Sequence, residues 1–241
     1  MMHQNIEALG AWLQTTPLLG LILTLLAYQG AMWIHRRMKG HTLANPVLIG
    51  VFIVITVLSI MKVDYQAYFQ SAQFIHFLLG PVTVALAVPL YAQIKPLVRL
   101  ASPLLISLTA GALSAIVLVV ALARPAGATR ETLLALLPKT ATAPIAMAMA
   151  DTLGTSASLV MACVMMTGIV GTLSAPLVFR LLGVQDEAVR GFALGLTAHG
   201  IGTARAFQES ERTGAFAALA MGLTGLLTAL IVPPLALWLA R

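Results

Sequence analysis

Long apolar runs, separated by short polar segments, make up almost the whole of this chain of 241 residues. We count eight runs, and most approach the ~20 residues that a helix needs to cross a bilayer. In hydrocarbon every backbone polar group must be bonded within the protein, so only helices and closed barrels span it. The residue alternation of barrel strands is absent. The sequence therefore predicts an all-α integral membrane protein, a polytopic bundle of about 7–8 transmembrane helices.

The charged residues support this class, because they are few and lie mostly between the apolar runs. Asp, Glu, Lys and Arg make up 9% of the chain, whereas soluble domains carry about 25%. The formal net charge of +6 fits the basic loops of a membrane protein better than a nucleic-acid surface. We therefore expect the lipid bilayer as a partner and no nucleic acid. Cys163 is the only cysteine, which excludes an intramolecular disulfide and a cysteine-based metal site.

The densest positive cluster follows the first apolar run and sets the expected orientation. That run covers residues 12–34, and the cluster that follows it contains His35, Arg36, Arg37 and Lys39. Basic residues near helix ends favour the cytoplasmic side, so we expect the N-terminus outside. Residues 1–10 lack the basic start of a secretory signal, so a cleaved signal peptide is not expected.

Small residues mark expected helix starts and packing faces. Asn45 precedes the apolar run that starts at residue 46, and its side chain suits a helix cap. Thr155 or Ser156 has the same place before a later run. Gly191 and Gly195 are four residues apart, a spacing that favours close packing of two helices.

One apolar stretch is broken in a way that predicts a binding site. Pro138 and Pro144 both lie within the run of residues 131–150. Two prolines at this spacing cannot lie inside one regular helix, because each removes an amide donor and clashes with the preceding turn. Lys139, Thr140 and Thr142 lie between them. Broken backbone in hydrocarbon is tolerated only where protein or a water-filled cavity satisfies it, so this segment is a site candidate.

The broken run has two possible paths, a full crossing or a re-entrant hairpin. A full crossing divides the loop lysines and arginines about evenly between the two sides. A re-entrant path places Arg180, Arg190 and Arg241 on the side of the Arg36 cluster. The positive-inside rule then modestly favours re-entrant segments or half-helices, which is the interpretation we prefer.

A second stretch resembles the broken one. Residues 79–85 align with residues 137–142 when Pro81 is placed on Pro138, and Thr83 then pairs with Thr140. We expect helix interruptions at Gly80 and Pro81 and again at Pro89. Paired broken segments in two halves of a chain are typical of transporter sites built from discontinuous helices. The match is short, so coincidence remains an equal alternative.

The polar residues of the broken segment have two interpretations each. Lys139 either extends to a nearby membrane surface or faces an anionic substrate, helped by backbone amides exposed at the break. The hydroxyls of Thr140 and Thr142 either bond the carbonyls that the prolines free or add donors to the site, and both can hold together.

A histidine and an arginine form the second candidate segment. His199 lies between apolar residues and is followed by Gly200 and Gly202, which weaken a helix and permit close backbone approach. Such a histidine is more often a packing residue, and the functional alternative is a proton carrier. Arg205 either marks the membrane edge, since charged residues follow it, or grips a carboxylate through two parallel hydrogen bonds.

Several motifs match a known family across nearly the whole chain. They are residues 45–50 (NPVLIG), 80–91 (GPVTVALAVPLY), 138–146 (PKTATAPIA), 167–171 (TGIVG), 198–206 (AHGIGTARA), 214–216 (GAF) and 219–221 (LAM). With them the chain resembles the LrgB/CidB family of bacterial membrane proteins. Thr140 departs from the serine expected in many relatives but keeps the hydroxyl.

The resemblance implies a location, partners and two kinds of function. It implies a multi-pass protein of the bacterial cytoplasmic (inner) membrane, with residues 1–241 as a single LrgB-like domain. It implies an antiholin-like or holin-like role in controlling murein hydrolase activity and autolysis, together with a small LrgA/CidA-like partner and as a homo-oligomer. It also implies carriage of carboxylates, because a plastid relative translocates glycolate and glycerate and bacterial relatives are linked to pyruvate. An elevator-type carrier fold is an analogy only.

Broken helices, interior hydroxyls and basic residues favour a carrier for small monocarboxylates, coupled to protons or exchanging anions. The runner-up is the antiholin-like or holin-like regulator, acting as an oligomeric pore or pore modulator. Motifs of hydrolytic enzymes and of metal or phosphate sites are absent, so we expect neither an enzyme nor a cofactor. The residues predicted to bind substrate are Lys139, Thr140, Thr142, His199, Arg205 and Thr83.

Overall fold

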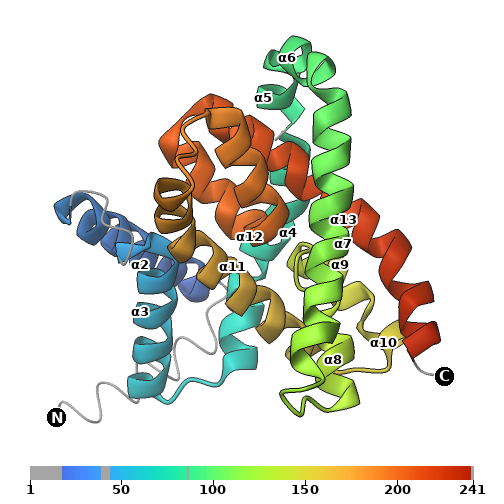
Figure 1. Ribbon diagram of the computed structural model, residues 1–241. Helices are drawn as coiled ribbons and strands as arrows, with labels where there is room; N and C mark the ends of the chain where they lie inside the picture. Colours follow the sequence, from blue (N-terminus) through green and yellow to red (C-terminus); the bar gives the residue numbers. More distant parts are fainter. Residues whose placement is uncertain (1–17, 39–43, 86, 240–241) are drawn as a thin grey trace, which may run out of the picture. The chain divides into compact units, whose positions relative to one another are not determined.

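The structure is a computed structural model that describes residues 18–38, 44–85 and 87–239. Every regular element in these ranges is a helix, so the predicted all-α class is confirmed (Figure 1). Lys39 and the start of the first predicted run lie outside the described residues. The helices are α2 (Leu19–Arg37), α3 (Pro46–Met61), α4 (Tyr65–Ala85), α5 (Ala87–Ala92), α6 (Ile94–Arg99), α7 (Ala101–Ala123), α8 (Arg130–Leu136), α9 (Ala143–Ala148), α10 (Ala150–Leu153), α11 (Ala157–Leu181), α12 (Glu187–Glu209) and α13 (Glu211–Leu239).

The chain divides into two compact units, residues 1–85 and 86–241. The first unit contains α2, α3 and α4, and the second contains α5 to α13. Of the residues predicted to bind substrate, Thr83 belongs to the first unit and the other five belong to the second.

Capping and a small residue position the helices of the first unit. The side-chain oxygen of Asn45 accepts a hydrogen bond from the Val47 amide at 2.8 Å, so the predicted cap of α3 is confirmed. α2 and α4 approach closely at Gly20, because a side chain there would overlap Ser71. One turn further along α2, the hydroxyl of Thr24 lies 2.7 Å from that of Tyr68.

The predicted interruption at Gly80 and Pro81 is wrong, because α4 continues through both residues to Ala85. An interior proline removes one amide donor, and here the helix bears that loss without ending. α5 is described from Ala87, and the residue between the two elements lies outside the described residues. The likeness of this stretch to residues 137–142 is therefore one of sequence and not of backbone.

Three prolines of the second unit lie in the first turn of a helix. They are Pro96 in α6, Pro103 in α7 and Pro144 in α9. The amides of a first turn have no intrahelical partner, so a proline there costs no hydrogen bond. α5 continues through Pro89 to Ala92, so the interruption predicted at that proline is not found among the described residues.

Among the described residues, three helices are long and apolar enough to cross a membrane. They are α7, with 23 residues, α11, with 25 residues, and α13. α3 is also apolar but shorter, with 16 residues. Ser156 caps α11 by accepting a hydrogen bond from the Leu159 amide at 3.3 Å, so the predicted start of this helix is confirmed.

The stretch around Pro138 is broken as predicted. α8 ends at Leu136 and α9 begins at Ala143, and neither helix exceeds seven residues. The turn between them is not a surface loop, because Leu137 and Ala141 are 1% and 0% exposed. Both residues belong to the apolar core that α8, α9 and α10 share with α7, α11 and α13. A short turn is therefore held inside the second unit.

α12 contains a complete reversal of direction. In a straight helix Arg190 and Glu209 would lie about 28 Å apart, at a rise of 1.5 Å per residue. Instead Arg190 Nη2 lies 2.7 Å from Glu209 Oε2. The chain turns at His199, whose φ of 40° and ψ of −128° are not helical. Residues 187–198 and 200–209 are therefore the two arms of a helical hairpin, which we call the α12 hairpin.

Glycines allow the α12 hairpin to close and to pack against α13. A side-chain carbon at Gly202 would overlap the carbonyl of Leu194 on the other arm. Carbons at Gly191 and Gly195 would overlap the main chain of α13 at Thr213 and Ala217. The close packing predicted for Gly191 and Gly195 is therefore confirmed.

Candidate functional site

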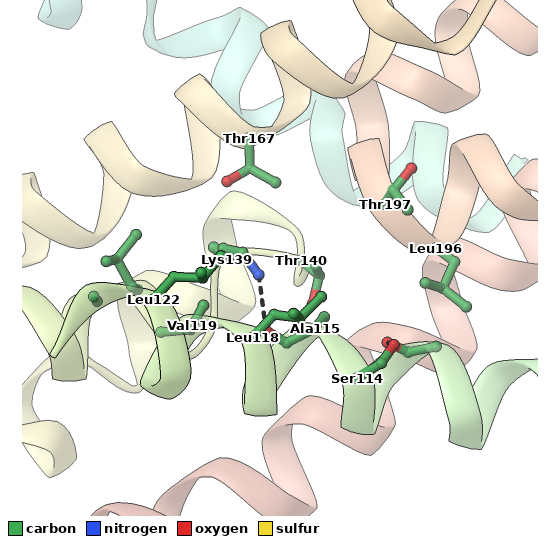
Figure 2. Close-up of a pocket in the computed structure, with 13 residues that line it drawn as sticks. Ser114, Ala115, Leu118, Val119, Leu122, Lys139, Thr140, Thr167, Leu196 and Thr197 are labelled. Carbon is green, nitrogen blue, oxygen red and sulfur yellow. Dashed lines mark hydrogen bonds between the residues drawn. The ribbon is translucent and has the colours of Figure 1, made fainter. Parts of the chain in front are cut away.

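The two broken segments meet at one pocket of the second unit. The pocket has a volume of about 620 Å³ and lies between α7, α11, the turn after α8 and the first arm of the α12 hairpin. Figure 2 shows Lys139 and Thr140 beside α7, with Thr167 of α11 and Thr197 of α12 facing the same space. The lining residues are Gly111, Ser114, Ala115, Leu118, Val119, Leu122, Ala123, Leu136, Lys139, Thr140, Thr167, Leu196 and Thr197.

Lys139 supplies the positive charge of this pocket. Its ammonium Nζ donates a hydrogen bond to the Ala115 carbonyl of α7 at 3.2 Å (Figure 2). Ala112 is the central residue of α7, so Ala115 lies only about 4.5 Å along the axis from the middle of the helix. If α7 crosses the bilayer, the ammonium lies near its mid-depth, which argues against the surface-seeking interpretation of this lysine. An ammonium has three donors, so two remain for a ligand.

Three threonines line the same pocket as Lys139, and their hydroxyls differ in the hydrogen bonds that they can still donate. Thr167 Oγ1 donates to the Cys163 carbonyl at 2.8 Å, and Thr197 Oγ1 donates to the Ala193 carbonyl at 2.7 Å. Both hydroxyls have thus used their single proton. Thr140 is 6% exposed, and its side chain has no hydrogen bond within the described part of the chain. Thr140 is therefore the hydroxyl donor that an anion beside Lys139 would meet.

His199 holds the tip of the α12 hairpin against α11. Its Nε2 donates to the Val164 carbonyl at 2.9 Å, and its ring fills the space above Gly168. The Thr203 hydroxyl donates to the His199 carbonyl at 2.8 Å. A positive φ is costly for any residue with a side chain, so the ring contacts and these bonds must compensate. His199 adjoins the pocket through Thr197 but does not line it.

Arg205 is engaged outside the pocket. Its Nε lies 3.6 Å from Glu209 Oε1, and its Nη1 lies 3.5 Å from Gln208 Oε1. Glu209 also bonds Arg190, so these charges clasp the open end of the α12 hairpin. The structure therefore does not bring Arg205 to Lys139, as a shared carboxylate grip requires.

The two remaining predicted residues also lie elsewhere. Thr142 is the residue before α9, and its hydroxyl makes no capping bond to that helix. Thr142 does not line the pocket. Thr83 lies in α4 of the first unit, and its side chain is outside the described residues.

The sequence did not reveal the contribution of α7. Gly111, Ser114 and Ala115 line the pocket, yet the run that contains them has the pattern of a plain apolar helix. Their spacing, small residues three and four apart, is the one local signal that marks this face. In the described ranges no three His, Cys, Asp or Glu side chains lie close enough together to hold a metal ion.

The family match decides what kind of protein this is. The model of the LrgB-like family matches residues 24–238. The chain belongs to the LrgB-like family. The resemblance read from the motifs is thus confirmed, and three helices of spanning length agree with a membrane protein.

Relatives of this LrgB-like chain match over almost their entire length. The holin-like protein CidB of Staphylococcus epidermidis is 28% identical, over 90% of this chain and 94% of CidB. The antiholin-like protein LrgB of Bacillus mycoides is 25% identical, over 90% of this chain and 95% of that protein. The uncharacterized protein YxaC of Bacillus subtilis is 31% identical, over 91% of this chain and 94% of YxaC. No solved structure matches the chain.

These names bear differently on the two functions expected from the sequence. Two relatives are named for holin-like or antiholin-like behaviour, and none of the three names mentions a carboxylate. The comparisons therefore support the antiholin-like or holin-like alternative better than the carrier. The support for carboxylate binding comes from the pocket alone.

Proposed function

We propose that this LrgB-like chain acts in the membrane as an antiholin-like or holin-like protein. The observation that carries this proposal is the family match over residues 24–238, with relatives of nearly equal length that bear these names. Under this proposal the protein controls murein hydrolase activity and autolysis, as a homo-oligomer and with a small LrgA/CidA-like partner. The role involves no enzymatic step and no cofactor.

A second function, carriage of small monocarboxylates, is favoured by one specific observation. Lys139 places a cation near the middle of α7, inside a pocket that also contains the uncommitted hydroxyl of Thr140. Lys139 is half-buried, and a cation at membrane depth is costly unless a counter-charge or ligand compensates it. Within the described residues Lys139 has no acidic partner, and a carboxylate of the glycolate, glycerate or pyruvate type would supply one.

The roles of Lys139 and Thr140 in binding an anion follow from the relative strength of a charge–charge attraction and a neutral hydrogen bond. Two unit charges 4 Å apart attract by about 4 kcal/mol at an effective dielectric constant of about 20. A neutral hydrogen bond contributes about 1 kcal/mol. Lys139 would therefore provide most of the affinity, and Thr140 would help to select the anion. His199 would position the hairpin tip, while Thr142, Arg205 and Thr83 stay predictions that mutagenesis must test.

We also propose how the chain lies in the bilayer. The α12 hairpin and the turn after α8 re-enter the membrane, and the spanning helices number about 7–8, with the apolar runs of the first unit among them. The membrane is the bacterial cytoplasmic (inner) membrane, with the N-terminus outside and the Arg36 cluster inside. An elevator-type movement of the broken segments is an analogy from carriers with discontinuous helices.

Purified protein in liposomes separates the two functions. A carrier gives counterflow of labelled glycolate or pyruvate that saturates with concentration and discriminates among carboxylates. A pore gives ion conductance that does not saturate at modest concentrations. Saturable exchange that Lys139→Met removes would establish the carrier, and conductance without saturable exchange would eliminate it. For the regulatory role, deletion of the gene should alter autolysis and murein hydrolase activity, and unchanged lysis with and without the LrgA/CidA-like partner would contradict it.

A further inference from the structure

A second pocket adjoins the Lys139 pocket. It has a volume of about 560 Å³ and lies where α7, the first arm of the α12 hairpin and the start of α13 come together. Its charged residues are Asp186 and Arg212. The carboxylate of Asp186 is already committed, because it accepts hydrogen bonds from the Ala188 and Val189 amides at 2.8 and 3.0 Å. Arg212 is exposed and remains as the cation of this pocket.

The two pockets follow one face of α7. Ser107 lines the second pocket, and Ser114 lines the Lys139 pocket. Gly111 lies between them, and residues four and three apart share one face of a helix. Leu196 and Thr197 of the α12 hairpin line both pockets. The pockets are therefore two parts of one groove between α7 and α12, divided beside Gly111.

Together the two parts extend along the whole of α7. The second pocket starts at Leu100, and the Lys139 pocket ends at Ala123. The 23 residues of α7 measure about 34 Å, slightly more than the ~30 Å thickness of the hydrocarbon core. Gly111 is one residue from the centre of this helix. The division of the groove is thus at mid-depth if α7 crosses the bilayer.

Leu196 is the side chain that divides the groove. It is 7% exposed, and its Cδ1 would lie 2.9 Å from a side-chain carbon placed on Gly111. The absence of a side chain at Gly111 is what admits the leucine. On the groove side Leu196 presents only methyl groups, which offer nothing to an anion. Thr197, the other shared residue, is exposed and does not fill the gap.

We propose that the two pockets are the two ends of a single path for a small carboxylate, and that Leu196, seated on Gly111, is its gate. The inference deepens the carrier proposal and rests on it for the identity of the anion. A cation lies on each side of the gate, Lys139 in one pocket and Arg212 in the other. The gate lies on the first arm of the α12 hairpin, three residues before its tip. A small displacement of that tip would therefore open or close the path.

Accessibility of single cysteines tests the gate without any substrate. The background is Cys163→Ala, which removes the one native thiol, and the reporters are Ser107→Cys and Ser114→Cys. Each is inserted into sealed vesicles of known orientation. Membrane-impermeant methanethiosulfonate ethylsulfonate, a small anion, is then added to one side. With Leu196 in place, the Ser107→Cys reporter should react from one side and the Ser114→Cys reporter from the other.

The gate variant should abolish this sidedness. Leu196→Ala should make the Ser114→Cys reporter react at least about tenfold faster from the side that reaches the Ser107→Cys reporter, a barrier lower by about 1.4 kcal/mol. Leu196→Val should give a smaller acceleration in the same direction. Leu118→Ala is the matched control, because it removes a leucine from the wall of the Lys139 pocket and leaves the division intact. Monodisperse elution in detergent verifies that each variant folds.

Three results would overturn the gate. The first is sidedness that Leu196→Ala and Leu196→Val leave unchanged in folded protein. The second is reaction of both reporter thiols from the same side while Leu196 is present. The third is reaction with a lipid-soluble maleimide but not with the anion, which would mean that lipid or a partner helix fills the groove. The labelling reaction needs no carboxylate, so it tests the gate independently of transport. If Leu196→Ala changes the sidedness but the protein shows no saturable exchange, the gate proposal stands and the carrier proposal fails.

Discussion

The two breaks in the helical backbone of the second unit reach the same pocket by different means. The break after α8 is caused by residues within the break itself, because Pro138 and Pro144 cannot both continue one helix. The break in α12 has no proline. It depends on His199, a residue with an unfavourable positive φ, and on the bond from that residue to Val164 of another helix. A local break can be predicted from the sequence, whereas for the second break the sequence shows only glycines that weaken a helix, and the reversal itself depends on distant packing.

The largest effect is expected from removing the charge of Lys139, the lysine of the proline break. Lys139→Met should lower carboxylate exchange at least about 30-fold, because removing one member of a desolvated charge pair costs 2 kcal/mol or more. Counterflow in liposomes measures it. Lys139→Arg should restore part of the exchange. Lys95→Met, at an exposed lysine of α6, is the matched control and should leave exchange unchanged. Normal exchange by Lys139→Met would show that the charge of Lys139 does not bind the carboxylate.

The next prediction breaks the α12 hairpin itself. Gly202→Ala places a methyl group on the Leu194 carbonyl of the other arm and should lower the stability by about 1–3 kcal/mol. Gly200→Ala is the matched control, since nothing lies within 4 Å of a side-chain carbon there. That substitution should be neutral or stabilise by up to about 1 kcal/mol. Thermal unfolding in detergent, followed by size-exclusion fluorescence, compares the two. Equal melting temperatures would mean that the arms do not pack at Gly202.

A smaller difference sharpens the contrast between the two breaks. His199→Ala and His199→Gly both lose the bond to Val164, but only alanine keeps a side chain at the positive φ. The glycine variant should therefore be more stable by about 1 kcal/mol or more. The same thermal assay measures this difference. A glycine variant no more stable than the alanine variant would show that the tip carries no backbone strain.

The smallest effect is expected at the open end of the hairpin. Arg205→Ala removes a long, partly buried ion pair with Glu209, with 3.6 Å between Nε and Oε1, and weak pairs of this kind contribute about 0–1 kcal/mol. Exchange should fall by less than about fivefold. Counterflow measurements test this. A complete loss of exchange with normal abundance would instead restore Arg205 as a carboxylate ligand, which is the role that its motif predicts.

Much of the local structure could be predicted from the sequence because its causes lie within a few residues. Asn45 and Ser156 act as caps because of their own side chains, and Pro138 breaks its helix because of its own ring. The local rule failed at Pro81, which remains inside α4. Proline weakens a helix by a limited amount, and the rest of the helix can compensate.

The candidate site was predictable only in part, because its contacts join distant segments. Lys139 and Thr140 were found because a charge and a hydroxyl interrupt an apolar run. Their partner Ala115 is 24 residues away, and it contributes a backbone carbonyl that any residue would provide. The engagement of Arg205 by Glu209 is a local pair, four residues apart. The sequence left this open, because the charged residues that follow Arg205 allowed an interpretation outside the site beside the ligand role.

The contact between Arg190 and Glu209 also bears on which side of the membrane the chain lies before and after α12. Since the two ends of α12 adjoin, we predict that this element does not carry the chain from one side of the membrane to the other. The segment before α12 and the segment after it are then expected to face the same compartment. Reporter enzymes fused at residues 184 and 210 would therefore give the same signal, and the start of α13 would inherit the compartment reached at the end of α11.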